Sequence, residues 1–347
     1  MAQSEMQTLM GSPASPYTRK MTALLRYRHI PYRLLLTEAD ELETLPKPKV
    51  KLLPTFFFAN EKGEVEAVVD STPIIRRFEK THSGRAAIPN NPVLEFLDFL
   101  LEDFADEWLT KAMFHYRWYY ETDIKKAAET LPYWRSTRPA SDNDLKKMSE
   151  EFGDRQISRL YVVGSNDTTA PVIEQSYERY ISALNTHLEN HMFLFGARPS
   201  SADFAAFGQL TQLAKFDPTP ATVTERQAPR VFAWVDMMDD LSGLNASDGD
   251  WLDPNALPES LINILKEVGR VYTPVMLANA EALRAEKDKV ETTVEGKPWV
   301  QQPFPYQGKC LQRLRERYAA LSESDKNQVD QILKGTGCEP LLDTQPS

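Results

Sequence analysis

The N-terminal part of the chain alternates between short apolar runs and helical patterns. The runs QTLM at residues 7–10 and PYRLLL at residues 31–36 have the length and aliphatic content of strands. Between them, residues 15–30 repeat apolar side chains at helical spacing, with a proline where a first turn favours one. The segment EADELETL, residues 38–45, predicts a second, short helix that ends before the next proline.

The pattern then changes to a hairpin followed by a helix. Residues 55–70 contain two β-rich runs that flank turn-forming residues at 60–63. The segment DSTPIIRRFEKTH, residues 70–82, predicts a helix with Ser71 as a cap and Pro73 in its first turn. The predicted order of elements is therefore β-α-β-α-β-β-α.

Helical periodicity dominates the middle of the chain. Residues 83–92, SGRAAIPNNP, have the composition of a linker. A long amphipathic pattern covers residues 93–120, and further helical patterns continue to about residue 241. One of them begins with the capping form Ser200-x-x-Asp203, in which side chains and backbone N–H groups satisfy each other.

The C-terminal hundred residues mix helical patterns with one hairpin. Residues 258–288 predict a helix interrupted near Pro274. Residues 289–302 alternate around a Glu-Gly pair and predict a hairpin, and residues 306–335 predict two more helices.

These patterns divide the chain into three expected units. We expect an α/β unit over residues 1–83 and an all-helical unit over residues 92–245. A mostly helical extension with a small hairpin, residues 250–347, is expected to pack on the helical unit and to cover its pocket.

Composition narrows the function classes. The chain has 347 residues and a formal net charge of -10, which argues against a nucleic-acid partner because backbone binding needs a basic surface. Cys310 and Cys338 make neither a disulfide framework nor a zinc site. We find no signal peptide pattern and no apolar run long enough to cross a membrane, so we expect a cytoplasmic protein.

Four short motifs occur in a recognisable order. SPYTRK, residues 15–20, lies where glutaredoxins and their relatives carry Cys-Pro-Tyr-Cys, and LLPTF, residues 52–56, places a proline before the third strand. VVDSTPII, residues 68–75, opens a helix with an acidic residue and a serine, and SSADF, residues 200–204, is a capping box. With these motifs, residues 8–240 resemble the cytosolic glutathione transferase superfamily; the resemblance does not explain the residues beyond them.

The resemblance implies a fold and a reaction. The fold is a thioredoxin-like domain followed by an all-helical domain. The implied protein is a serine-type glutathione transferase, in which the thiolate of glutathione, a co-substrate, attacks a hydrophobic electrophile, and no metal takes part. Disulfide exchange needs a protein thiolate, so the serine and threonine at the two cysteine positions argue against a glutaredoxin-like reductase.

Ser15 is the first candidate for stabilising the thiolate. It precedes the first helix, where its hydroxyl and the free N–H groups of the first turn would favour an anion. Ser12 is the alternative donor, and Tyr17 is a weaker third choice that would lie beside bound glutathione. A serine here is also an ordinary helix N-cap.

The resemblance assigns the remaining glutathione contacts. Leu53 would pair through its backbone with the cysteinyl part, next to a cis peptide bond at Pro54. Asp70 and Ser71 would hold the γ-glutamyl end, which they could do while also capping a helix. Lys51 could reach the glycyl carboxylate, although leucine stands two positions before the proline, where the family often has a basic residue.

Aromatic residues and two histidines complete the candidates. Phe114, Tyr116 and Trp118 would line the electrophile pocket, although aromatic side chains at helical spacing more often pack in a core. His187 and His191 lack a third metal ligand, and we expect them on a solvated helix face.

A second function class stays open. The departure near Pro54 and the long extension are equally compatible with a catalytically inactive, glutathione-binding or protein-interaction module. The resemblance also implies a homodimer, which the extension could block.

Overall fold

A four-stranded sheet forms the N-terminal part of the computed structural model, which describes residues 6–343. Its order is β2-β1-β3-β4, with β1 parallel to β2 and the other pairs antiparallel. The strands are β1 (Gln7–Gly11), β2 (Tyr32–Leu36), β3 (Thr55–Ala59) and β4 (Val65–Val68).

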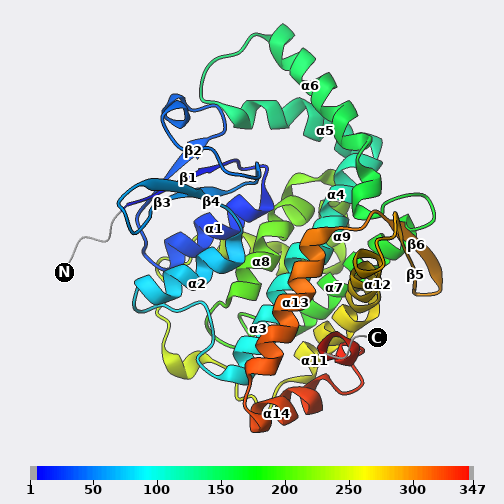
Figure 1. Ribbon diagram of the computed structural model, residues 1–347. Coiled ribbons are helices and arrows are strands. Elements are labelled where there is room, and N and C mark those ends of the chain that lie inside the picture. The colour runs from blue at the N-terminus through cyan, green and yellow to red at the C-terminus, as the bar shows by residue number, and fades with distance from the viewer. Residues whose placement is uncertain (1–5, 344–347) are drawn as a thin grey trace.

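Two helices pack the sheet against the rest of the molecule (Figure 1). They are α1 (Pro16–Tyr27) and α2 (Ser71–Thr81), and α1 also packs closely on a helix of the following part, α8 (Ser201–Leu210). The helix predicted at residues 38–45 is only a 3₁₀ turn, Asp40–Glu43, none of whose residues is buried. An element without a buried face lacks the packing that sustains most short helices.

The middle of the chain is helical, as predicted. The long predicted helix at 93–120 is α3 (Pro92–Phe104) followed by a π-helical segment (Ala105–Leu109) and α4 (Thr110–Tyr119). The capping box at Ser200 and Asp203 is present at the start of α8. The other helices of this part are α5 (Glu121–Thr130), α6 (Asp142–Ile157), α7 (Ala170–His187), α9 (Pro218–Gln227) and α10 (Pro229–Met238).

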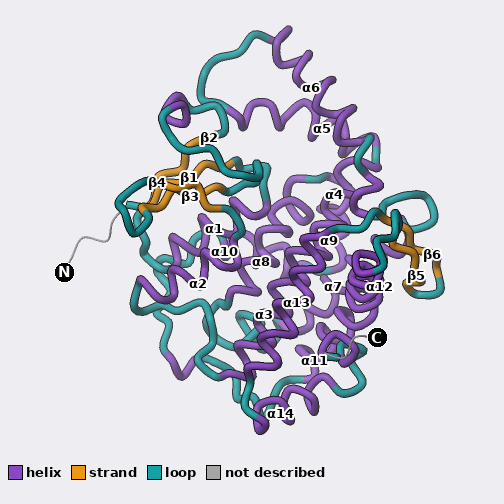
Figure 2. The backbone as a smooth tube through the Cα atoms, in the orientation of Figure 1, coloured by secondary structure: helices purple, strands orange, loops and turns teal. Residues whose placement is uncertain are grey.

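The C-terminal segment folds onto these helices (Figures 1 and 2). Its elements are α11 (Glu259–Glu267), a π-helical segment (Val268–Tyr272), α12 (Thr273–Arg284), β5 (Val290–Val294), β6 (Lys297–Gln301), α13 (Pro305–Ala320) and α14 (Glu323–Leu333). The hairpin and the two last helices are as predicted. Helix α11 packs on α7, and α13 and α14 lie against α3, so Leu261, Leu311 and Val329 join the main hydrophobic core.

The fold class is therefore the predicted one: a thioredoxin-like α/β part followed by helices. The boundaries of the three expected units stay a prediction, because one hydrophobic core runs through all of them. The expectation for His187 is wrong: its side chain is fully buried, because α11 of the C-terminal segment covers that end of α7.

Candidate functional site

Ser15 lies at the N-cap of α1, half-buried. Its Oγ accepts the backbone N–H of Thr18 at 3.2 Å, which is the ordinary capping role. The same Oγ lies 3.5 Å from the carbonyl oxygen of Leu53, to which it donates. Two motifs 38 residues apart in sequence therefore meet at the N-terminus of α1.

Ser12 is directed into its own loop. It is buried, its Oγ accepts the N–H of Ala14 at 3.3 Å, and its N–H donates to Oγ1 of Thr18 at 3.3 Å. The loop is closely packed here, because a Cβ on Gly11 would lie 2.6 Å from the side chain of Thr18. Of the two serines, Ser15 is the one whose hydroxyl reaches across to the loop before β3.

Three polar side chains hold the loop before α1 in place. Arg117, buried on α4, binds Asp217 through two nitrogens and donates to the carbonyl of Ala14 at 3.4 Å. Gln212 and Arg19 both donate to the carbonyl of Pro13, at 3.3 and 3.2 Å. A loop fixed by side chains from three helices has a defined geometry before any ligand arrives.

The peptide bond between Leu53 and Pro54 is cis, as predicted. Lys51 is exposed, in the loop that leads to Pro54. The backbone of Leu53 therefore contacts the half-buried Ser15, two residues after an exposed lysine.

Asp70 and Ser71 lie at the start of α2, where Ser71 does not hold the predicted cap position. Asp70 is the N-cap, at φ 84°, and Ser71 is the first helical residue. The carboxylate of Asp70 accepts from Nη1 of Arg313 at 2.9 Å, and Oγ of Ser71 accepts from Nζ of Lys20 at 3.1 Å. Both predicted glutathione contacts thus have charged neighbours that the sequence did not indicate.

Lys20 is the centre of a buried charge cluster beneath Ser71. Its Nζ donates to Oε1 of Glu102 at 2.8 Å and to Oδ2 of Asp106 at 2.6 Å. Burial disfavours the charge on Lys20, but Asp106 and Glu102 outweigh burial and raise its pKa. Burial likewise opposes the Glu102 carboxylate, but Lys20 and Arg76 outweigh it and lower its pKa. Lys20 is therefore a fixed ammonium at the start of α2.

Sequence reasoning missed this cluster, although a signal for it exists. Asp98, Glu102 and Asp106 recur at every fourth position within the otherwise apolar pattern LDFLLEDFADEW. Carboxylates at this spacing share one helix face, and an acidic stripe in an apolar helix predicts a buried cation.

The hydroxyl of Tyr17 is hydrogen-bonded away from Ser15. Its hydroxyl donates to the backbone carbonyl of Asp106 at 2.7 Å. Burial, followed by the nearby charge of Glu107, raises the pKa of Tyr17. The side chain of Tyr17 therefore connects α1 to the π-helical segment Ala105–Leu109.

The predicted aromatic residues divide between two places. Phe114 and Trp118 lie in a small cluster with Ala14 of the loop, and their ring centroids are 6.4 Å apart. Tyr116 lies on the other side of α4, in the main core, 5.7 Å from the ring of Tyr177. The structure therefore brings two of the three beside the loop that carries Ser15.

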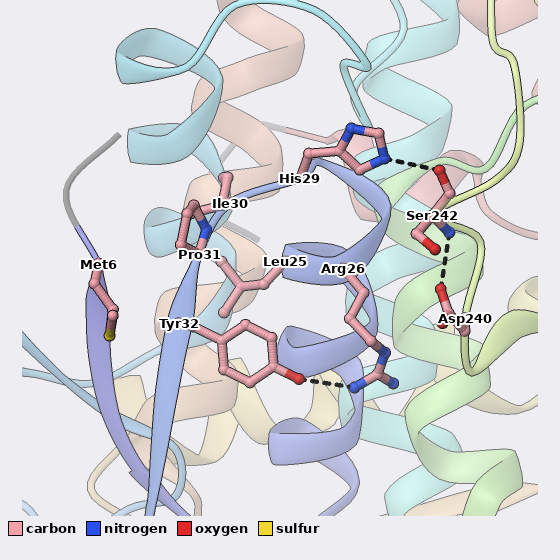
Figure 3. Close-up of a pocket in the computed structure, with 9 residues that line it drawn as sticks. All are labelled: Met6, Leu25, Arg26, His29, Ile30, Pro31, Tyr32, Asp240 and Ser242. Atoms are coloured by element: carbon pink, nitrogen blue, oxygen red, sulfur yellow. Dashed lines mark hydrogen bonds between the residues drawn. The ribbon is translucent and has the colours of Figure 1, made fainter. Parts of the chain in front are cut away.

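A cavity of about 410 Å³ lies elsewhere, at the C-terminal end of α1 (Figure 3). Its polar rim includes His29, bonded to the carbonyl of Ser242, and Arg26, bonded to the hydroxyl of Tyr32. A second cavity, of about 240 Å³, lies between β2 and residues 136–138. Neither cavity is lined by a predicted site residue.

Two features bear on other kinds of site. Among residues 6–343, no three His, Cys, Asp or Glu side chains are grouped so as to hold a metal ion. None of the helices in this described range has the length and apolarity needed to cross a membrane.

Two family models match the chain, one in its N-terminal part and one in its helical part. The family model described as the glutathione S-transferase N-terminal domain matches residues 9–86, and that of the glutathione S-transferase C-terminal domain matches residues 142–236. The chain belongs to the glutathione S-transferase superfamily. The serine-type subclass stays a prediction, and neither match extends into the C-terminal segment.

Several solved structures of bacterial proteins are similar to the chain. The beta-etherase LigF from a Sphingobium strain matches with 16% identity and a TM-score of 0.48, covering 67% of this chain and 94% of that one. A GST-like protein from Pseudomonas syringae matches with 18% identity and a TM-score of 0.39, covering 68% and 67%. A glutathione transferase from Burkholderia graminis, solved with two glutathione molecules per subunit, matches with 17% identity and a TM-score of 0.41, covering 71% and 92%. No curated protein matches the chain.

Proposed function

We propose that the protein is a glutathione transferase-like enzyme in which Ser15 keeps the sulfur of bound glutathione ionised. The observation that carries the proposal is the position of Ser15 Oγ. It lies at the N-terminus of α1, 3.5 Å from the carbonyl of Leu53. A hydroxyl, the N-terminus of α1 and the backbone of Leu53 therefore meet at one point.

The pKa of the glutathione thiol sets how much stabilisation the thiolate needs. A free thiol has a pKa near 8.5, so only a few per cent is ionised at pH 7. Lowering that pKa by about 2 units makes most of it thiolate, which requires about 2.7 kcal/mol of differential stabilisation. One hydroxyl hydrogen bond to a charged sulfur, together with a helix N-terminus, supplies an effect of this order.

The remaining contacts follow the direction of the tripeptide. The backbone of Leu53 pairs with the cysteinyl residue in the manner of an added strand. Asp70 and Ser71 receive the γ-glutamyl end, and the exposed Lys51 reaches the glycyl carboxylate. The loop before α1 needs no rearrangement, because Arg117 and Gln212 already hold it.

The electrophile enters beside Phe114 and Trp118. Phe114 is half-buried and packs on the same small cluster as Ala14, while the buried Trp118 lies behind it. An aromatic side chain near the loop that carries Ser15 favours an apolar substrate. Tyr116 supports this wall from within the core instead of touching the substrate.

Spectroscopy of bound glutathione tests the assignment of Ser15. We expect Ser15→Ala to lower the thiolate absorbance of bound glutathione at pH 7 and to reduce turnover of a generic electrophile by about 10²-fold. Ser12→Ala is the matched control, since it removes the other serine hydroxyl of the same loop. An unchanged thiolate fraction in Ser15→Ala, with the thiolate lost in Ser12→Ala, would transfer the role to Ser12.

One observation favours the second candidate, a glutathione-binding module without catalysis. The hydroxyl of Tyr17 donates to the backbone carbonyl of Asp106 at 2.7 Å, so this third candidate donor is not directed at Ser15. Calorimetric titration with glutathione, combined with an assay of conjugation, separates the two functions. If glutathione binds with a micromolar to millimolar dissociation constant and no electrophile in a broad panel is conjugated, the protein is a binding module.

A further inference from the structure

The C-terminal segment reaches the predicted γ-glutamyl site through one face of α13. Tyr306, Cys310, Arg313 and Arg317 follow one another at spacings of four, three and four residues, which places them on a single helix face. This helix lies along α3 (Figure 1). Nη1 of Arg313 donates from it to the carboxylate of Asp70, at the start of α2. A residue outside both family matches thus meets a motif inside one of them.

The contact is a charge pair in which only one partner is well buried. Nη1 of Arg313 lies 2.9 Å from Oδ2 of Asp70, and the exposed fractions of the two side chains are 41% and 13%. A guanidinium has five N–H donors in a planar fork, and one bond to Asp70 leaves donors to spare. An exposed pair of this kind adds little to stability, so the stability of the fold does not account for it.

Polar groups of α1 and α2 surround the Asp70–Arg313 pair. Oγ of Ser71 and the first N–H groups of α2 lie next to Asp70, and the buried ammonium of Lys20 lies behind Ser71. The ammonium of Lys20 is already paired with Glu102 and Asp106. The charged groups with bonding capacity to spare at the start of α2 are therefore the carboxylate of Asp70 and the guanidinium of Arg313, which match a group that carries both charges at once.

We propose that Arg313 is a substrate-positioning residue that binds the α-carboxylate of the γ-glutamyl residue, while Asp70 accepts from its α-ammonium. The free amino-acid end of glutathione is zwitterionic, and the Asp70–Arg313 pair offers the opposite charge to each of its two groups. The C-terminal segment is therefore part of the binding site. This inference rests on the proposed function, because it presupposes that glutathione binds at α2.

Calorimetric titration of the full chain with two ligands tests the assignment. The first ligand is glutathione, and the second is γ-aminobutyryl-cysteinylglycine, which keeps the ammonium and lacks the α-carboxylate. We expect Arg313→Gln to weaken glutathione binding about tenfold or more and to change binding of the second ligand less than twofold. Arg313→Lys should recover part of the affinity, since it restores the charge without the fork.

Arg317→Gln is the matched control. Arg317 lies one turn further along the same face, where it pairs with Glu95 at 3.1 Å instead of Asp70. We expect this variant to lose as much thermal stability as Arg313→Gln and to bind glutathione like the wild type.

Three results would overturn the inference. Unchanged or tighter glutathione binding by Arg313→Gln would show that Arg313 contributes nothing or competes with the ammonium. Equal weakening for both ligands would assign Arg313 a purely structural role. Absence of glutathione binding by the wild type would reject the proposed function itself, and the inference with it.

Discussion

Lys20 shows how strongly a buried charge depends on groups far away in sequence. Its two carboxylate partners, Glu102 and Asp106, lie 82 and 86 residues further along the chain. Lysine is almost never fully buried unless it is paired, so its own position gives no sign of burial. Ser15 differs, because its position at the start of a helix can be predicted from local sequence alone.

Removing the cation should destabilise the fold. Lys20→Met leaves Glu102 and Asp106 buried without their shared partner, and we expect a loss of about 3 kcal/mol or more in the free energy of unfolding. Urea denaturation measures this loss. Lys146→Met, at an exposed position on α6, serves as control and should change stability by about 0.5 kcal/mol or less. Equal stability of the two variants would show that the cluster is hydrated instead of sealed.

Single elements were predicted well where their patterns are local. The periodicity of α7, the capping box of α8 and the turn of the β5–β6 hairpin are all set by neighbouring residues. The predictions failed where a distant element decides the outcome. His187 was placed in solvent because its partner, Ser260 at 2.9 Å, belongs to a helix that follows a long irregular segment.

The junction between α7 and α11 should weaken in mild acid. Burial lowers the pKa of His187 to about 4, whereas an unfolded chain has a histidine pKa near 6.5. Between these values the unfolded chain binds the proton more tightly, so the contribution of His187 to stability is lost as pH falls from about 6.5 to 4.

Comparison with a variant isolates this effect from the carboxylates that titrate over the same range. His187→Gln keeps a donor for the carbonyl of Phe193 and cannot gain a proton. The wild type should lose about 3 kcal/mol more than the variant between pH 7 and pH 4 in urea denaturation. Parallel pH profiles would show that His187 becomes protonated without cost.

At the scale of the whole molecule, the C-terminal segment is part of the core. Its apolar residues, among them Leu261, Ile264 and Leu314, are fully buried in the same cluster as residues from the sheet. Helical periodicity and the hairpin turn were enough to predict its elements. Contact with Asp70 could not be predicted, because the approach of α13 depends on how all earlier helices pack.

Truncation tests this dependence. We expect a chain that ends at residue 257 to aggregate on expression, because it exposes the apolar faces of α3 and α7. Light scattering and size-exclusion chromatography measure the outcome. Co-expression of residues 258–347 should restore soluble protein, and a monodisperse, folded truncation would contradict the expectation.

The pairing of Asp70 with Arg313 also has a consequence for synthesis on the ribosome. The two residues are separated by 243 positions, so the sheet and α2 emerge long before the arginine is translated. A nascent chain can fold its thioredoxin-like part early and still lack Arg313, which is one half of the proposed site for the γ-glutamyl end. Tight retention on an affinity resin that presents the γ-glutamyl group would then select fully translated molecules over prematurely terminated ones.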